Sequence, residues 1–340
     1  ISRNGLGRNN LLYIALVLSH LENVPNYNND TFFHLLGIEE PEAHLHPHLQ
    51  KHLSFNIHKQ LCEKFNTDEC EKEKPKEERK CDRKCQRQQL LMTTHSTHIS
   101  SHLPLKYTAV LFNDDKTKSI TSKYIVDGVG KEHIVHLRKY LDATNSAMFY
   151  ARKIIFVEGI SEELLIPKLF QIQNGTTLEA KGISLVNVRG ISFKHFLEVI
   201  KKGYFVKCLV LTDRDSGAKT EDRADKLKEQ YEKIDSTLFR VEISSQKTFE
   251  KDIFESNKSN EGRRKILLEA LKACKPKVGK DMETKYKNKE LNVDEFYGNM
   301  EDIKANYALM LASEINDKIC IPKYIENGFK YLLGIDEEDK

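Results

Sequence analysis

The sequence predicts an α/β protein whose second part is built on a doubly wound parallel sheet. From residue 153 onward, short apolar strands alternate with amphipathic helices, which is the pattern of parallel βαβ units. Two of these strands end in carboxylates, and an earlier apolar run at 32–38 ends in Glu39 and Glu40. Because ligands bind at the carboxyl ends of the strands in such sheets, we expect the functional residues there.

The composition bounds the kind of protein. At 340 residues the chain is too long for one ordinary domain and suits two. No apolar stretch approaches the roughly 20 residues of a membrane span, and no signal peptide opens the chain. Seven irregularly spaced cysteines do not describe a disulfide framework, so we expect a cytoplasmic protein with no membrane partner. A net charge of +3 does not itself indicate a nucleic-acid binder, so DNA contacts must come from local patches.

The first half of the chain is expected to mix short strands and helices. Helices are predicted at 11–24 and 47–62, and strands at 32–38, 89–94, 106–113 and 119–126. Residues 63–88 are almost entirely polar with mixed charges, which favours a solvated insertion, either a mobile loop or a helical arm. In the second half the strands are expected at 153–159, 183–188, 207–213 and 237–242, with helices at 161–171, 192–202 and 221–233.

Four acidic side chains are expected at one edge of the second sheet. Glu158 ends a strand, and Glu162 lies four residues later on the first turn of the next helix. Asp213 and Asp215 follow a later strand, where the alternation of an extended segment puts both on one face. Repulsion among four clustered carboxylates is offset by hard divalent cations bound through oxygen. For each acid taken alone, helix capping or a plain surface charge is the alternative.

The strings VEGISEELLIPKL and VLTDRDSG resemble the Toprim domain, whose pattern is a strand-end Glu and a later Asp-x-Asp. The Glu-x-x-x-Glu spacing is similar to that of the overcoming-lysogenization-defect (OLD) family of nucleases, and TFEKDIF, KANYALMLA and IPKYIENGFKYL resemble further motifs of that family. The resemblance implies that Lys304 is catalytic and stabilises transition-state charge on a phosphate; without it, Lys304 would read as a surface lysine. Arg189-Gly190 departs from the Gly-Gly turn expected there. The metal ligands implied by the resemblance are Glu158, Glu162, Asp213, Asp215, Glu250 and Asp252.

The same resemblance implies a reaction. Two Mg²⁺ or Mn²⁺ ions per Toprim site would be the cofactors, with Ca²⁺ as a candidate inhibitor. A pair of such ions stabilises the attacking and leaving oxygens of a phosphodiester, so the expected activity is endonucleolytic hydrolysis of DNA, as a nick or a double-strand cut. The family also implies defence against phage or other foreign DNA, with an accessory defence protein as a candidate partner.

The front half carries a second resemblance. HLLGIEEPEAHLHPHLQ resembles the Walker B strand and D-loop of an ABC-type ATPase, which implies that Glu39 helps to hold Mg²⁺ and Glu40 positions the attacking water. QLLMTTHSTH resembles the switch-histidine loop and would bring His95 to the γ-phosphate. SRNGLGRNN resembles the signature loop, with Ser2 and Gly5 directed at the nucleotide of a partner subunit. A zinc or surface cluster is the alternative for the histidines.

One ATPase motif has no counterpart in this sequence. No G-x-x-x-x-G-K-[ST] string occurs, and DGVGKEH at 127–133 lacks the first glycine and the Ser/Thr. We therefore expect residues 1–147 to be the C-terminal part of an ABC-type ATPase domain and residues 148–340 to be a Toprim nuclease domain. Because the chain opens on Ile1 with a motif in its first ten residues, we expect an N-terminal portion to be missing. In the full-length protein ATP would regulate cleavage, and the ATPase part would form a homodimer.

Alternative functions stay open. The protein would be an ATP-dependent DNA-binding clamp if its Toprim acids formed a regulatory metal site that cleaves nothing. A primase or topoisomerase would bring a zinc domain or a tyrosine nucleophile, and neither is recognisable here. The basic stretch at 258–289 either grips DNA phosphates or is a solvated face. Cys81 and Cys85 belong either to a zinc knuckle or to a solvated arm with free thiols.

Overall fold

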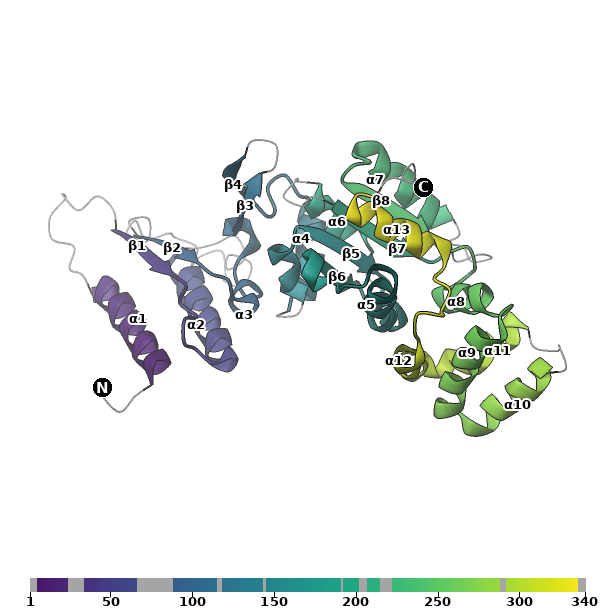
Figure 1. Cartoon of the computed structure of the whole chain (residues 1–340). Helices are drawn as coiled ribbons and strands as arrows, with labels where there is room; N and C mark the ends of the chain where they lie inside the picture. The colour runs from purple at the N-terminus through teal and green to yellow at the C-terminus, as the bar shows by residue number, and fades with distance from the viewer. Residues whose placement is uncertain are drawn as a thin grey trace. The chain divides into compact units, whose positions relative to one another are not determined.

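A computed structural model describes residues 5–23, 34–65, 88–114, 118–142, 145–190, 192–201, 207–214, 222–287 and 292–335. Ser2, Asp215, Cys81 and Cys85, as well as most of the polar insertion, lie outside the described residues. The chain divides into two compact units, shown in Figure 1. Unit 1 comprises Ile1–Val110, Tyr124–Asp127 and Leu137–Tyr150, and unit 2 comprises Leu111–Lys123, Gly128–His136 and Ala151–Lys340.

Unit 1 contains a parallel pair of strands. β1 (His34–Glu39) pairs with β2 (Gln88–Thr93), and the register sets Glu39 opposite Thr93. The helices α1 (Leu6–Asn23) and α2 (Pro47–Phe65) enclose a small apolar core that consists of Ile14, Leu45, Leu53 and Ile57. The short helices of the unit are α3 (Thr97–Ser100), η3 (Leu105–Tyr107) and η4 (Asn145–Tyr150). The strands and helices predicted for residues 11–94 therefore form, although α1 begins five residues earlier than expected.

β3 (Ala109–Asp114), β4 (Ser119–Tyr124) and α4 (Lys131–Tyr140) lie in sequence between the sheet of unit 1 and the sheet of unit 2. β3 and β4 pair with each other in a separate two-stranded sheet. They are followed by α4, within which the chain passes from unit 2 to unit 1.

The sheet of unit 2 is parallel throughout and has the strand order β6-β5-β7-β8. Its strands are β5 (Lys153–Val157), β6 (Ile183–Asn187), β7 (Lys207–Thr212) and β8 (Phe239–Ile243). All are short and largely buried, as expected for strands covered on both faces. β5 and β7 are direct neighbours, so Glu158 and Asp213, which follow them, lie at the same edge of the sheet.

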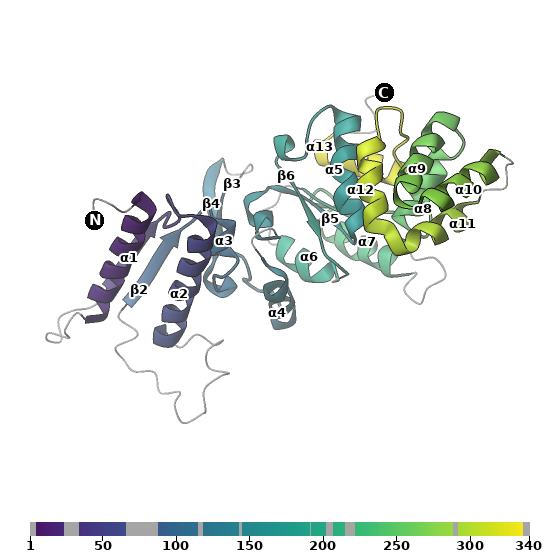
Figure 2. The same ribbon diagram turned by 90° about the horizontal axis from the view of Figure 1, so that it is seen from below.

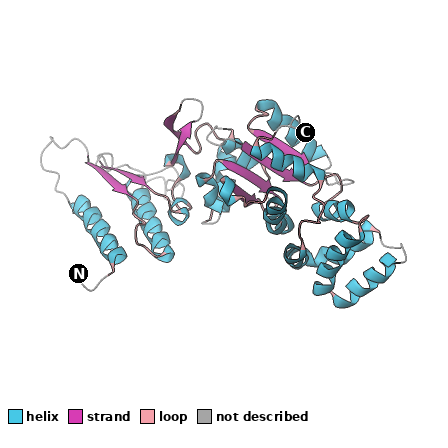
Figure 3. Ribbon diagram, viewed as in Figure 1, coloured by secondary structure: helices cyan, strands magenta, loops and turns pink. Residues whose placement is uncertain are grey.

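Helices cover both faces of this sheet, as Figures 2 and 3 show. On one face Ile155 and Leu209 pack against α5 (Ile160–Asn174) and α13 (Lys323–Leu333) in one apolar core. On the other face Phe156 meets Phe196 of α6 (Lys194–Ile200), and Phe239 meets Tyr231 of α7 (Asp222–Ile234). The alternation of side chains along the strands thus gives the doubly wound arrangement that the sequence predicts.

A cluster of helices follows the sheet. It consists of α8 (Phe249–Asn257), α9 (Glu261–Cys274), α10 (Pro276–Lys287), α11 (Val293–Met300) and α12 (Lys304–Glu314). Some cations of the basic stretch at 258–289 are paired within this cluster: Lys272 with Glu283 at 2.7 Å, and Lys275 with Asp302 at 2.6 Å. None of the described helices is long and apolar enough to cross a membrane.

The turn after β6 resolves the departure noted at Arg189-Gly190. Both residues have positive φ, 50° and 75°. The side chain of Asn187 accepts a hydrogen bond from the Arg189 amide at 2.8 Å. The turn therefore forms with an arginine in the left-handed conformation, which side chains other than glycine rarely adopt.

Candidate functional site

The acidic edge of unit 2 is built from the ends of β5 and β7 and from the first turns of two helices. Glu158 follows β5, and Asp213 follows β7. Glu162 lies in the first turn of α5, and Glu250 in the first turn of α8. The four carboxylates lie close enough to repel one another, because the charges of Glu158, Glu162 and Glu250 all act on Asp213.

Glu162 is the most enclosed of these acids, with only 7% of its surface exposed. Its carboxylate folds back over Gly159, where an added Cβ would lie 3.1 Å from Glu162 Oε2. The glycine therefore makes room for the carboxylate at the start of α5. Burial raises the pKa of Glu162 to about 7, and the charges of Glu250 and Glu158 act in the same direction.

Asp213 is in a similar environment. Burial raises its pKa well above the usual range, and the charges of Glu162, Glu158 and Glu250 raise it further. A hydrogen bond from the backbone amide of Phe249 opposes this rise. The negative charges of ionised Asp213 and Glu162 are therefore only partly balanced by their surroundings. A bound cation would balance them.

Glu250 is held by its surroundings in an ordered position. Thr248 caps α8 by accepting a hydrogen bond from the Lys251 amide, and the acidic first turn suits the positive end of the helix. Ser161 Oγ donates to Glu250 Oε1 at 2.8 Å. The side chain of Glu250 is therefore oriented from α5 as well as from its own helix.

Lys304 is the first residue of α12 and faces this edge. Its Nζ lies 3.7 Å from Glu250 Oε1 and 5.0 Å from the ring centre of Tyr297. Burial would lower the pKa of Lys304, but a hydrogen bond with Tyr297 and the charge of Glu250 outweigh it and raise the pKa. A cation at the N-terminus of a helix opposes the helix dipole, so helix stability does not account for a lysine here.

Asp252 has a different set of partners. Its Oδ2 accepts hydrogen bonds from the amides of Ser245 (2.6 Å) and Gln246 (3.1 Å) in the loop after β8. Burial raises the pKa of Asp252, whereas these two hydrogen bonds lower it. The contacts of Asp252 thus hold a loop, and a ligand role for it stays a prediction.

Glu158 is engaged by two neighbours. Thr212 Oγ1 donates to its Oε1, and Arg223 Nη2 lies 2.9 Å from Oε1 and 3.0 Å from Oε2. In this arrangement no three His, Cys, Asp or Glu side chains among the described residues stand close enough to enclose a metal ion. The donor set still fits Mg²⁺ or Mn²⁺, because it consists of carboxylate oxygens whose buried charges are only partly balanced.

Unit 1 has its own strand-edge site. The parallel pairing of β1 with β2 brings the two predicted loops together, and His95 Nε2 lies 3.2 Å from Glu40 Oε1. Glu42 Oε1 accepts a hydrogen bond from the His95 amide at 2.6 Å. Glu40 has a φ of 41°, a conformation that costs free energy and clusters at functional sites. Glu39, the last residue of β1, precedes it directly.

The segment predicted as a signature loop begins α1. Gly5 O accepts hydrogen bonds from the amides of Arg8 (3.1 Å) and Asn9 (3.2 Å). At Gly7 an added Cβ would lie 2.2 Å from His44 O, so only glycine fits against the loop after β1. Contact with a nucleotide stays a prediction for Gly5, as it does for Ser2.

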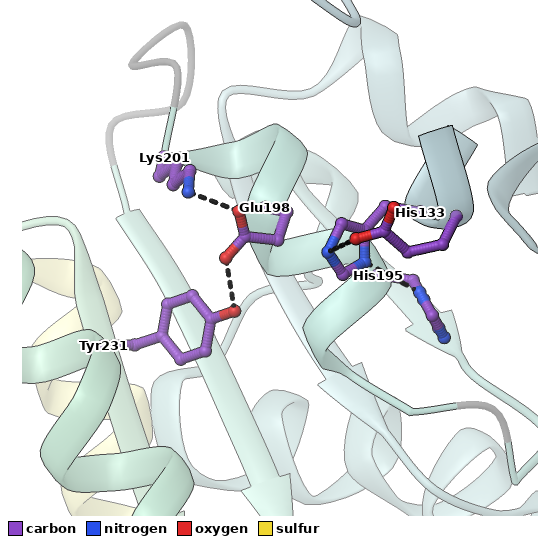
Figure 4. Close-up of polar contacts among 6 residues, drawn as sticks. His133, His195, Glu198, Lys201 and Tyr231 are labelled. Carbon is purple, nitrogen blue, oxygen red and sulfur yellow. Dashed lines mark hydrogen bonds and ion pairs between the residues drawn. The ribbon is translucent and has the colours of Figure 1, made fainter. Parts of the chain in front are cut away.

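A histidine cluster in unit 2 was missed from the sequence. Figure 4 shows His133 and His195, whose Nδ1 atoms are 2.9 Å apart, beside Glu198 and Tyr231. The ring of His136 stacks on His195 with centroids 4.1 Å apart. Burial and the two neighbouring imidazoles lower the pKa of His195. The i, i+3 spacing of His133 and His136 was the sequence signal that could have predicted the cluster. Its contacts join α4 to α6.

Comparisons with known proteins give matches for both halves of the chain. Residues 149–215 match the family model "Overcoming lysogenization defect protein-like, TOPRIM domain", and residues 1–100 match "AAA ATPase domain". Endonuclease GajA of Bacillus cereus (strain HuB5-5) is 25% identical over 96% of this chain, which spans 53% of that protein's length. The C-terminal region of the Burkholderia pseudomallei OLD protein (23% identity, TM-score 0.43) covers 54% of this chain and 98% of its own. The C-terminal region of the Xanthomonas campestris pv. campestris OLD protein (20% identity, TM-score 0.41) matches over 54% of this chain and 93% of its own length.

The parallel sheet with its acidic edge and the matched front segment define an α/β protein with a Toprim domain and an AAA-type ATPase domain. This confirms the predicted fold class. Residues 149–215 are thus similar to the Toprim domain of overcoming-lysogenization-defect (OLD) proteins, and the chain as a whole is similar to a protein named Endonuclease GajA. It spans about half the length of the relative it matches.

Proposed function

We propose that the chain is the cleavage unit of a divalent-metal-dependent DNA endonuclease. The observation that carries the proposal is the acidic edge, where the charges of neighbouring carboxylates raise the pKa of both Glu162 and Asp213 and Lys304 lies 3.7 Å from Glu250. Structural acids need no such buried cluster, since burying like charges together destabilises a fold. The match to a protein named as an endonuclease supports the same reaction class.

The residues that would hold Mg²⁺ or Mn²⁺ are Glu158, Glu162, Asp213 and Glu250, together with Asp215 and Asp252. When bound, a pair of such ions supplies Lewis-acid stabilisation of the attacking and leaving oxygens of a phosphodiester. Lys304 adds positive charge beside Glu250, where the phosphate becomes more negative in the transition state. Ser161 keeps Glu250 oriented, so the ligand does not need to reorganise during the reaction.

In the longer protein we propose that the unit 1 site binds ATP and regulates cleavage. Glu40 and His95 are its central residues, since their contact at 3.2 Å joins the ends of two parallel strands. Homodimerisation through this part, cytoplasmic location and defence against foreign DNA belong to the same proposal. Ca²⁺ is proposed as an inhibitor, because its larger, more flexible coordination would fill the site without supporting the reaction.

A plasmid assay tests the proposed activity. Supercoiled plasmid incubated with the chain and Mn²⁺ should be converted to nicked or linear DNA. Asp213→Ala should abolish this conversion, whereas Asp317→Ala, at an exposed aspartate of the same unit, should cut like the parent. A parent that binds the plasmid in Mn²⁺ and leaves it supercoiled would instead favour the DNA-binding clamp.

A further inference from the structure

Glu158 has an unexpected partner for a proposed metal ligand. Arg223, the second residue of α7, places one guanidinium nitrogen 2.9 Å and 3.0 Å from the two carboxylate oxygens. The arginine reaches the end of β5 from a helix that follows β7 in sequence. An arginine keeps its charge at any ordinary pH, so this is a permanent cation at the acidic edge.

Among the described residues, two cations of this edge pair with two different carboxylates. Lys304 lies at Glu250, and Arg223 lies at Glu158. The pairs differ in exposure: the Glu250 side chain is 7% exposed, whereas Glu158 is 24% exposed and Arg223 49%. The Arg223 pair is therefore the one that solvent can open at low cost, since exposed ion pairs contribute little stability.

A metal ion on Glu158 would weaken the attraction between its carboxylate and a guanidinium, because the metal neutralises the carboxylate charge. Both oxygens of Glu158 are within hydrogen-bond distance of Arg223 Nη2, so metal ligation by Glu158 competes directly with the arginine. Of the described acids near the start of α7, Asp222 pairs with Lys226 at 3.5 Å and Asp225 with Arg214 at 3.9 Å. A displaced Arg223 is thus half-exposed beside the proposed cleavage site, and both of these acids already have a cation partner.

We propose that Arg223 is a charge-exchange residue: it pairs with Glu158 in the metal-free site and with a phosphate oxygen of bound DNA once Glu158 holds a metal ion. The planar guanidinium suits a phosphate as well as a carboxylate. The inference rests on the proposed function, since it assumes that Glu158 is a metal ligand and that DNA is the substrate.

Charge exchange makes metal binding and DNA binding interdependent. The contribution of Arg223 to DNA affinity should appear only when divalent metal is present. By linkage, DNA should tighten metal binding through the same residue by the same factor. An ordinary DNA-binding arginine would contribute equally with and without metal, so the dependence on metal separates the two.

The test uses the whole chain and two measurements. Mn²⁺ affinity, followed by the EPR signal of free Mn²⁺, should increase about three- to tenfold in Arg223→Gln, because the competing cation is gone. Affinity for a short DNA duplex, followed by fluorescence anisotropy, should fall about five- to tenfold in Ca²⁺ and stay unchanged in EDTA. Arg240→Gln is the matched control, since Arg240 pairs with Glu242 at 2.8 Å and is 40% exposed; it should change neither quantity.

Each other outcome has a definite meaning. An equal loss of DNA affinity in Ca²⁺ and in EDTA, or an unchanged Mn²⁺ affinity, overturns the exchange. Asp213→Asn, measured in parallel, separates this failure from a failure of the proposed function. If Asp213→Asn abolishes Mn²⁺ binding while Arg223→Gln changes nothing, only the exchange is wrong. If Asp213→Asn binds Mn²⁺ like the parent, the metal centre itself is wrong.

Discussion

Glu162 shows at the scale of one residue what the acidic edge costs the fold. Burial raises its pKa from the ordinary 4.5 of a glutamate to about 7. A carboxyl whose pKa rises on folding contributes stability that is full below the unfolded pKa and is lost as the pH rises through the folded pKa. The window for this loss therefore runs from about pH 4.5 to pH 7, and its size is about 3 kcal/mol.

Glu162→Gln should therefore stabilise the metal-free chain at pH 8 by about 2–3 kcal/mol and give almost no gain at pH 4. The free energy of unfolding in urea with EDTA measures this. Glu163→Gln is the control, because the neighbouring glutamate accepts a hydrogen bond from Asn187 at 2.7 Å that glutamine can also accept. A gain of equal size at both pH values would show that the carboxylate is not destabilised by its charge. Added Mn²⁺ should stabilise the parent more than the variant.

Lys304 is the second residue with a sharp prediction. Lys304→Ala should lower the nicking rate by about 10²–10³, because it removes positive charge from the place where the phosphate becomes more negative. DNA affinity should weaken only mildly, since one phosphate contact among several is lost. Lys304→Arg should restore little activity, because the guanidinium does not reproduce a compact point charge.

Lys323 offers a matched comparison for Lys304. It is also the first residue of a helix in unit 2, and it is exposed. Lys323→Ala should nick DNA at the parental rate. Parental nicking by Lys304→Ala would refute the assigned role, whereas an unfolded Lys304→Ala, detected by circular dichroism, would shift the test to Lys304→Arg and Lys304→Gln.

At the scale of elements, the packing of α13 on β7 depends on a glycine. An added Cβ at Gly328 would lie 2.7 Å from Leu209 Cδ2, and Leu209 is fully buried. Gly328→Ala should destabilise the chain by about 1–3 kcal/mol, since overpacking outweighs the better helix propensity of alanine. Gly298→Ala, in the interior of α11 with no atom within 4 Å of the new Cβ, should instead stabilise it by up to about 1 kcal/mol. Thermal unfolding of both variants decides the point.

The sequence predicted elements well where their physical signal is local. The apolar strands β5 and β7 were evident from their residues alone, and with them the carboxylates that follow, Glu158 and Asp213. The helices α9–α11 were not, because their polar faces dominate the stretch and their apolar positions pack against other helices: α9 against α12, α10 against α9, and α11 against α8. Hydrophobic periodicity identifies an element, but it does not identify the partner that the element packs against.

The site itself was predictable only in part for the same reason. Glu250 and Lys304 came from resemblance to a family, since nothing local distinguishes them from surface charges. Arg223 and Ser161 were missed, because their importance lies in contacts with Glu158 and Glu250 across 65 and 89 residues of chain. Such pairs exist only after the strands are ordered in the sheet.

At the scale of the whole molecule, the two sites should be separable. The purified 340-residue chain should not turn over ATP, because its sequence has no Walker A loop to cradle the phosphates. Plasmid nicking should persist, since all proposed ligands lie at or after Glu158. Phosphate release in the presence of ATP and Mg²⁺ measures ATP turnover. The Glu40→Gln variant should nick plasmid at the parental rate. Robust ATP turnover that is lost in Glu40→Gln would show that unit 1 is more complete than its motifs indicate.

The crowded carboxylates of unit 2 also bear on how such a protein changes over evolutionary time. Each replacement of Glu162 or Asp213 by a neutral residue is expected to abolish chemistry and to make the metal-free fold more durable. Selection for fold stability alone would therefore favour early replacement of these acidic residues. A duplicated copy released from the need to cut should keep its sheet and lose these acids early, and acids that persist at both positions would then mark the copies in which cleavage is still under selection.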